Sequence, residues 1–215
     1  MQPDDLEALV LDHLTEEFLT GAIRAVFQAR DLADRFCAAN FEEAEAENLR
    51  PLIARAKVNE YLRGMTDRIP NCTARVAHSD GSSIQRTELA SGPIRLTAHA
   101  VQYPCGKVKE YQYRRSLAEG NAPTLFDMEL PLTDTLYAVL LHGPYRPRNL
   151  TEVGSYRGIP GSIYLAFPSA ELKDYAYRID LIGRYQSLVN TLLPSEWGED
   201  AKVFYRWQAA ARDVG

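Results

Sequence analysis

Apolar residues in the first third of the chain recur at the three- and four-residue spacing of an amphipathic helix. The stripe runs through Leu6, Leu9 and Val10 and continues through Ile23. This spacing predicts that residues 4–67 are helical almost throughout.

Local signals divide this helical region into segments. Gly21 is predicted to interrupt or bend the first run, a second helix is expected over residues 29–39, and Asn40 is a suitable stop. Pro51 is predicted to begin another helix, since proline is tolerated in a first helical turn. A group of carboxylates after Asn40 would suit the positive end of a helix dipole. Its members are Glu42, Glu43, Glu45 and Glu47.

The pattern changes to alternation after residues 69–71, and glycine and proline turns then follow at short intervals. The Asp80-Gly81 pair is a hairpin signal between two alternating runs. Four successive strands with short turns are typical of an antiparallel meander. The predicted strands cover residues 72–78, 83–89, 94–100 and 107–115, with two further buried strands at 135–142 and 162–167.

Apolar residues return to helical spacing after Pro168, where Ser169 can cap a helix. Leu172, Ile179 and Ile182 follow this period and predict a long helix that ends before Pro194. A short last helix is expected near residues 204–211.

Together these elements predict an α+β fold with a helical N-terminal third and an antiparallel meander of about five to six strands. A long C-terminal helix would pack on the sheet. We expect a helical segment over residues 1–68, either independent or packed on the sheet, and an α+β domain over residues 69–215.

Composition restricts the class of protein. Hydrophobic residues make up 46% and charged residues 25% of the chain, as in globular proteins. The longest apolar runs are far shorter than the roughly 20 residues that cross a bilayer. The acidic start of the chain is not followed by the apolar segment of a secretory signal, and the three cysteines lie far apart. We therefore expect a cytoplasmic protein without a membrane partner.

Charge is distributed unevenly along the chain. The net charge is −5; residues 1–68 hold 14 acidic and 8 basic side chains, −6 net, whereas residues 69–215 carry +1. This balance argues against a general nucleic-acid coat but leaves room for a local basic site. The acidic helical region is predicted to contact a protein partner or a second copy of the chain.

A long segment between the last two predicted core strands is the main candidate site. About twenty loop-like residues are unusual in a compact domain, and this segment is rich in arginine and tyrosine. Arginine binds phosphate or carboxylate with two hydrogen bonds, and tyrosine adds a stacking surface. The candidate ligand-binding residues are His142, Tyr145, Arg146, Arg148, Tyr156 and Arg157. Alternatively, the arginines of this loop pair with the acidic helical region.

A second candidate is the run Lys109, Tyr111, Tyr113 and Arg115, which would share one face of a strand. Aromatic rows flanked by cations stack single-stranded bases in several small domains. The competing interpretation is that these tyrosines pack under a helix, with their hydroxyl groups at the edge.

No motif in the chain specifies a reaction, and we expect neither a metal site nor a cofactor. The sequence is best interpreted as a non-catalytic binding or regulatory protein that engages an anionic ligand or nucleic acid. The alternative is a metal-dependent nuclease or another enzyme acting on phosphodiesters or nucleotides. Its candidate residues would be Glu88, Glu110, Asp127 and Glu129, with Lys107 and Lys109 nearby.

Overall fold

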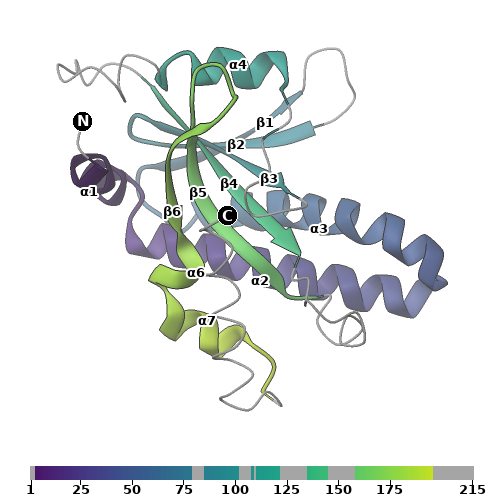
Figure 1. Ribbon diagram of the computed structural model, residues 1–215. Helices are drawn as coiled ribbons and strands as arrows, with labels where there is room; N and C mark the ends of the chain where they lie inside the picture. Colours follow the sequence, from purple (N-terminus) through teal and green to yellow (C-terminus); the bar gives the residue numbers. More distant parts are fainter. Residues whose placement is uncertain are drawn as a thin grey trace.

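The computed structural model describes residues 3–78, 85–101, 108, 110–121, 135–144 and 158–195. In this part of the chain, six strands form one sheet, with α2 and α3 along one face and α4 on the other (Figure 1). The helices are α1 (Pro3–His13), α2 (Glu16–Asn40), α3 (Glu43–Thr66), α4 (Gln112–Ala118), α6 (Leu181–Arg184) and α7 (Gln186–Leu192). The strands are β1 (Cys72–His78), β2 (Gln85–Ser91), β3 (Ile94–Ala100), β4 (Leu136–Pro144), β5 (Pro160–Pro168) and β6 (Tyr175–Asp180). The predicted α+β class and the helical N-terminal third are confirmed.

Helices α2 and α3 are longer than predicted. The hydroxyl of Thr15 caps α2 by accepting a hydrogen bond from the backbone N–H of Phe18 (3.3 Å). The predicted break at Gly21 is wrong, because α2 continues through this residue and packs closely there against Met65 of α3. The predicted end at Asn40 is confirmed.

The predicted start of a helix at Pro51 is also wrong. Helix α3 begins at Glu43 and passes through Pro51 without ending. Glu43 and Glu45 occupy its first turn, where their charges favour the exposed N–H groups of the helix. The carboxylate-rich start that the sequence indicates is therefore confirmed, eight residues before the proline.

The first three predicted strands are present. Strands β1 and β3 have the predicted bounds, and β2 lies two residues later than predicted. Strand β2 lies between the other two and is antiparallel to both. The two later predicted strands correspond to β4 and β5, which form an antiparallel pair.

The fourth predicted strand, over residues 107–115, is wrong, because α4 begins at Gln112. Strands β3 and β4 are parallel neighbours, from Ile94 opposite Leu136 onward. A parallel pair requires a connection that crosses one face of the sheet, since the chain must return to the same end. Helix α4 lies in this connection, so the sheet is mixed and not an antiparallel meander throughout.

The long C-terminal helix is likewise wrong. Strand β6 occupies the middle of the predicted helix and pairs with β5, and in the described residues up to 195 only short helices follow it. Tyr175, Tyr177 and Ile179 fit a two-residue period, and Tyr175, Ala176 and Ile179 fit a helical one, so the apolar pattern alone does not separate strand from helix. Asp180 caps α6 by accepting a hydrogen bond from the N–H of Ile182 (3.0 Å). The predicted last helix lies outside the described residues.

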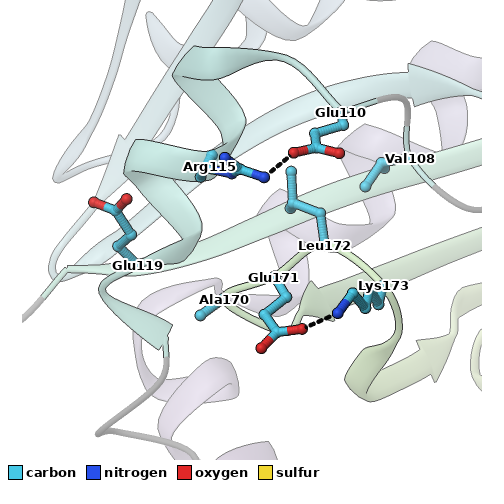
Figure 2. Close-up of a pocket in the computed structure, with 8 residues that line it drawn as sticks. All are labelled: Val108, Glu110, Arg115, Glu119, Ala170, Glu171, Leu172 and Lys173. Carbon is cyan, nitrogen blue, oxygen red and sulfur yellow. Dashed lines mark hydrogen bonds and ion pairs between the residues drawn. The ribbon is translucent and has the colours of Figure 1, made fainter.

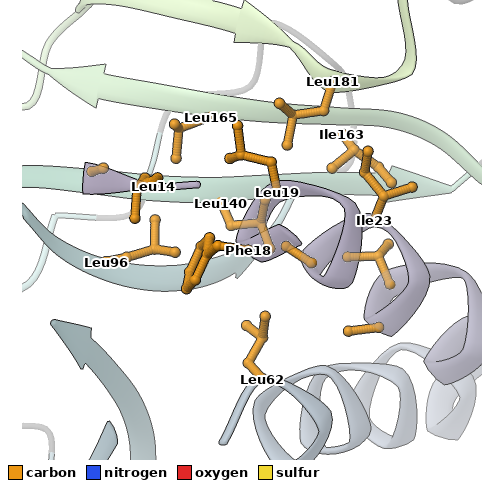
Figure 3. Packing of buried hydrophobic residues seen from close by; sticks show 14 of the residues in the cluster. Leu14, Phe18, Leu19, Ile23, Leu62, Leu96, Leu140, Ile163, Leu165 and Leu181 are labelled. Carbon is orange, nitrogen blue, oxygen red and sulfur yellow. The ribbon is translucent and has the colours of Figure 1, made fainter. Parts of the chain in front are cut away.

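The larger hydrophobic core joins the N-terminal helices to the sheet. Phe18, Leu19 and Ile23 of α2 and Leu62 of α3 point toward the strands, as Figure 3 shows. The strands contribute Leu96, Leu140, Ile163 and Leu165 to the same cluster. The opposite face has a smaller core, which includes Tyr137, Val139 and Tyr164. Because β4 is covered on both faces, nearly all of its residues are buried.

Polar contacts tie the N-terminal helix to the last elements of the fold. The carboxylate of Glu7 in α1 accepts hydrogen bonds from the hydroxyl of Tyr177 (2.8 Å) and from the guanidinium of Arg184. These bonds lower the pKa of Glu7, the bond from Arg184 contributing most. Within the described part of the chain, no helix is both long and apolar enough to cross a membrane.

Asn121 completes the sheet at the start of β4. Strand β5 pairs with β4 only from Val139 onward, and Pro168 has no N–H to donate there. The buried amide of Asn121 accepts from the N–H of Tyr137 (2.7 Å) and donates to the carbonyls of Tyr137 (2.9 Å) and Pro168 (2.8 Å). One side chain thus supplies the partners that a neighbouring strand would otherwise supply.

We expect Asn121→Ala to lower the free energy of unfolding by roughly 2–4 kcal/mol, because it leaves buried backbone groups without partners. Urea unfolding followed by circular dichroism measures this change. The control is Asn48→Ala on the exposed surface of α3, which should change stability by no more than about 0.5 kcal/mol. Equal effects of the two substitutions would contradict the role assigned to Asn121.

Candidate ligand-binding site beneath helix α4

Charged side chains of β2 point toward the face of the sheet that α4 covers. Thr87 points to the other face, where its hydroxyl accepts a hydrogen bond from Arg63 of α3 (2.8 Å). Since successive residues of a strand point to opposite faces, Arg86 and Glu88 lie on the α4 side. The guanidinium of Arg86 indeed lies over the ring of Tyr113 in α4.

Glu88 is a buried carboxylate held by two arginines. Its side chain is 5% exposed and accepts hydrogen bonds from Arg75 Nε (2.7 Å) and from Arg86 Nε (2.9 Å) and Nη2 (2.6 Å). Arg75 lies directly opposite Glu88 in the β1–β2 register. Arg86 also donates to the backbone carbonyl of His78. These bonds compensate the cost of removing the carboxylate from water, and the group as a whole carries a net positive charge.

Two stacked tyrosines continue this group toward the solvent. The rings of Tyr111 and Tyr113 are 5.9 Å apart between centroids and 14° from parallel. Arg86 Cζ lies 3.6 Å from the centroid of the Tyr113 ring, and Arg114 Cζ lies 5.2 Å from that of Tyr111. Both distances fall within the range of cation–π attraction.

We refer to six of these residues as the Arg–Tyr cluster. They are Arg75, Arg86, Glu88, Tyr111, Tyr113 and Arg114.

Further polar contacts lie beneath α4. Arg114, which is 3% exposed, has its Nη2 3.0 Å from His99 Nδ1. The hydroxyl groups of Thr97 and Tyr137 are 2.7 Å apart in the buried layer. Burial raises the pKa of Tyr137 to about 12, and it also raises the pKa of Tyr113. Both phenols are therefore neutral at physiological pH and act through hydrogen bonding and stacking.

The Arg–Tyr cluster has the composition of an anion-binding surface. It contains three guanidinium groups and one carboxylate, and both of its ends are accessible. The side chain of Arg75 is 74% exposed, and Tyr111 is 41% exposed. An arginine beside an open aromatic ring can bind a phosphate or carboxylate group while a planar group stacks on the ring.

The structure places the second predicted candidate differently from the sequence. Tyr113 and Arg115 lie on a helix and not on a strand, and Lys109 lies outside the described residues. Tyr113 is buried, as the packing interpretation requires, whereas Tyr111 is exposed. The two tyrosines do stack next to cations, although the predicted two-residue alternation of a strand is wrong.

Among the six predicted ligand-binding residues, the structure describes only His142. Its side chain is fully buried on the α2 side of β4, where Arg30 Nη2 lies 3.3 Å from Nδ1. Arginine can only donate, so Nδ1 accepts and the proton of the neutral imidazole is on Nε2. Burial lowers the pKa of His142 well below its usual value, and the nearby Arg30 lowers it further.

The other predicted site residues lie outside the described part of the chain. They are Tyr145, Arg146, Arg148, Tyr156 and Arg157. The first described residue after them is Gly158, which lies against α2: a Cβ on it would be 3.2 Å from Asp31 Cα and 3.4 Å from Asp34 Cβ. The segment therefore ends beside two acidic residues of α2. Both predictions for the loop, ligand binding and pairing with the acidic helices, stay open.

A hollow of about 580 Å³ lies between α4 and the turn that precedes β6 (Figure 2). Arg115 pairs with Glu110 on one side, and Lys173 pairs with Glu171 (2.5 Å) on the other. Lys173 lowers the pKa of Glu171, and Arg115 adds to this effect. Since Glu119 also lines the hollow, carboxylates outnumber cations there, which makes it a poorer anion site than the Arg–Tyr cluster.

The carboxylates proposed for a nuclease have other roles where they are described. Glu88 is bound by Arg75 and Arg86, and Glu110 by Arg115. The described residues include no group of three or more His, Cys, Asp or Glu side chains that could hold a metal ion. Asp127, Glu129 and the two lysines lie outside the described residues, so the nuclease alternative stays a prediction.

No protein-family model matches the chain, and no curated protein or solved structure is significantly similar to it. The candidate site therefore depends on the geometry of the chain itself.

Arg75, Arg86 and Arg114 were not predicted as site residues from the sequence. The run Arg86-Thr87-Glu88 does indicate an ion pair on one face of the strand, because residues two apart in a strand point to the same side. A carboxylate on a strand between two turns suggests a cation on the neighbouring strand. No comparable pattern in the sequence indicates that Arg114 reaches the sheet.

We expect acid to destabilise the protein through His142. Its folded-state pKa is depressed, so the associated stability is present above the unfolded-state pKa of about 6.5 and is lost as the pH falls. Between pH 7.5 and 5.5 this histidine should reduce the free energy of unfolding by on the order of 1 kcal/mol. Urea unfolding across this range measures the slope.

His142→Gln should remove that part of the pH dependence, whatever its effect on stability at pH 7.5. The control is His78→Gln at the exposed end of β1, which should keep the wild-type slope. An unchanged slope in His142→Gln would show that His142 is not the group responsible.

Proposed function

We propose that this chain is a non-catalytic binding protein that holds an anionic ligand on the Arg–Tyr cluster. The observation that carries the proposal is the continuous set of contacts from exposed Arg75, through Glu88, Arg86 and Tyr113, to exposed Tyr111. The excess of guanidinium groups favours a phosphate-bearing ligand, and the open ring favours a planar group beside the phosphate. A nucleotide or a short single strand of nucleic acid has both.

The interior of the cluster would position its accessible ends. Arg86 uses its hydrogen bonds on Glu88 and on the His78 carbonyl, and its planar face lies on Tyr113. Tyr113 in turn fixes the ring of Tyr111 by stacking. A ligand would then meet a rigid ring and a rigidly supported charge, which lowers the entropic cost of binding.

The loop arginines are a second part of the proposal. Arg146, Arg148 and Arg157 would engage the same class of anionic ligand, as their number and spacing in the sequence suggest. The acidic helical region, residues 1–68, would contact a protein partner or a second copy of the chain. This interaction suits an accessory or regulatory protein.

The test measures binding of a fluorescein-labelled dT12 oligonucleotide by anisotropy, with ATP and inorganic phosphate as competitors. Arg75→Ala combined with Tyr111→Ala should weaken binding roughly 10- to 100-fold, because one phosphate contact and one stacked base are lost. Arg75 is one of the two arginines that hold the buried Glu88, so the melting temperature of the variant is measured and binding is compared where both proteins are folded. Arg55→Ala, on the exposed surface of α3, is the matched control and should bind like the wild type.

Each possible outcome decides between parts of the proposal. Loss of binding only in the combined variant Arg146→Ala, Arg148→Ala and Arg157→Ala would assign the ligand to the loop and exclude the cluster. Competition by ATP indicates that the ligand is a nucleotide, whereas competition by phosphate alone indicates that stacking on the Tyr111 ring does not contribute to the affinity. Absence of binding by all three probes at low salt would overturn the anionic-ligand proposal.

A further inference from the structure

The end of the α2–α3 hairpin exposes large apolar side chains that the fold does not use. Phe36 is 46%, Phe41 39% and Leu52 54% exposed. Among the described residues, only two other large apolar side chains, Val76 and Tyr111, are comparably exposed. The rings of Phe36 and Phe41 lie side by side, and we refer to these two residues as the hairpin-end patch.

Small residues close the hairpin at this end. Ala33 and Cys37 of α2 and Ala46 and Ala54 of α3 are buried, and each is small enough for the two helices to approach closely. The hairpin-end patch lies outside this contact. Its large side chains are therefore not required to hold α2 and α3 together.

The aromatic residues of the patch form a preformed unit. The rings of Phe36 and Phe41 are 6.1 Å apart between centroids and meet edge to face at 60°. One ring comes from the last turns of α2 and the other from the residue that follows α2. A partner would bind an aromatic surface that is already arranged, at low cost in side-chain entropy.

The charge around the patch is negative. Residues 36–49 contain four glutamates and neither lysine nor arginine. The nearest flanking cations are paired within the hairpin, Arg35 with Asp31 (2.6 Å) and Arg50 with Asp34 (2.7 Å) and Glu43 (3.9 Å). The patch is thus flanked along the chain by an excess of carboxylates.

The patch is accessible to a large partner. The turn between α2 and α3 projects beyond the ends of the strands, as Figure 1 shows. Two copies that met through this end would bring two groups of glutamates together, and their repulsion disfavours self-association. A partner that presents lysine or arginine around an apolar pocket is complementary in both charge and surface type.

We infer that the hairpin-end patch is a docking surface for a second, basic protein, which receives the two phenylalanines in an apolar groove rimmed by lysine or arginine. The inference rests on the proposed role of the acidic helical region, and it selects a basic partner over a second copy. It is independent of the anionic ligand at the Arg–Tyr cluster, which lies beneath α4.

The probe is a fluorescein-labelled amphipathic 14-residue peptide with a leucine stripe at helical spacing and lysine elsewhere. The full chain should bind it with an affinity that falls as salt rises from 50 to 200 mM. Phe36→Ser and Phe41→Ser together should weaken binding at least tenfold, although the net charge is unchanged. Val76→Ser is the matched control on the exposed part of β1, and it should bind the peptide like the wild type.

Replacing Glu42, Glu43, Glu45 and Glu47 by glutamine should remove most of the salt dependence while the melting temperature is monitored. The same peptide with glutamate in place of lysine should not bind. Equal binding by the double serine variant, or by the acidic peptide, would overturn the inference. Dimerisation of the wild type, abolished by the serine substitutions in sedimentation equilibrium, would also overturn it and assign the patch to a second copy.

The Arg75→Ala, Tyr111→Ala variant separates this inference from the anionic-ligand proposal. It should bind the lysine peptide like the wild type. If it lost the peptide as well as dT12, the peptide would not be bound at the hairpin end, and the docking surface would be excluded.

Discussion

The parallel pairing of β3 with β4 is the constraint on which the rest of the structure depends. It makes the chain cross one face of the sheet between these strands, and the described part of that crossing is built around α4. The α2–α3 hairpin covers the opposite face, so the central strands are buried on both sides. Polar residues of the sheet on the α4 side must then find partners inside the protein instead of in water.

This requirement explains the chemistry beneath α4. On an open sheet, water would solvate the charges of Arg86 and Glu88. Under a helix, this solvation is replaced by their mutual hydrogen bonds, by Arg75 and by an aromatic ring. The same layer contains Arg114 with His99 and the buried hydroxyl pair of Thr97 and Tyr137. A surface that is polar for structural reasons can also bind a ligand, because its groups are already oriented and its edges reach the solvent.

The sequence predicted the parts of the fold that are determined by local pattern. Strands β1 and β3 alternate clearly, and the carboxylate-rich start of α3 suits its dipole. The segment Tyr175–Asp180 satisfies both a strand and a helix period, so only its pairing with β5 decides between them. The helix over Gln112–Ala118 follows from the parallel pairing of distant strands, which no local pattern encodes.

The candidate site was less predictable because it depends on register. A two-residue turn at Asp80-Gly81 would place Arg75 opposite Arg86, with two like charges facing each other. The actual register places Arg75 opposite Glu88, and β2 starts two residues later than predicted. A difference of two residues in a hairpin thus converts a repulsion into the ion pair from which the Arg–Tyr cluster extends.

The contacts of Glu7 have a consequence for biosynthesis. Its partners Tyr177 and Arg184 follow it by 170 and 177 residues, so the ribosome must add that many residues before these bonds can form. During translation, α1 emerges well before β6 and α6, yet it completes its polar contacts with them only after both have emerged. Helix α1 therefore waits for a distant part of the chain to complete its attachment.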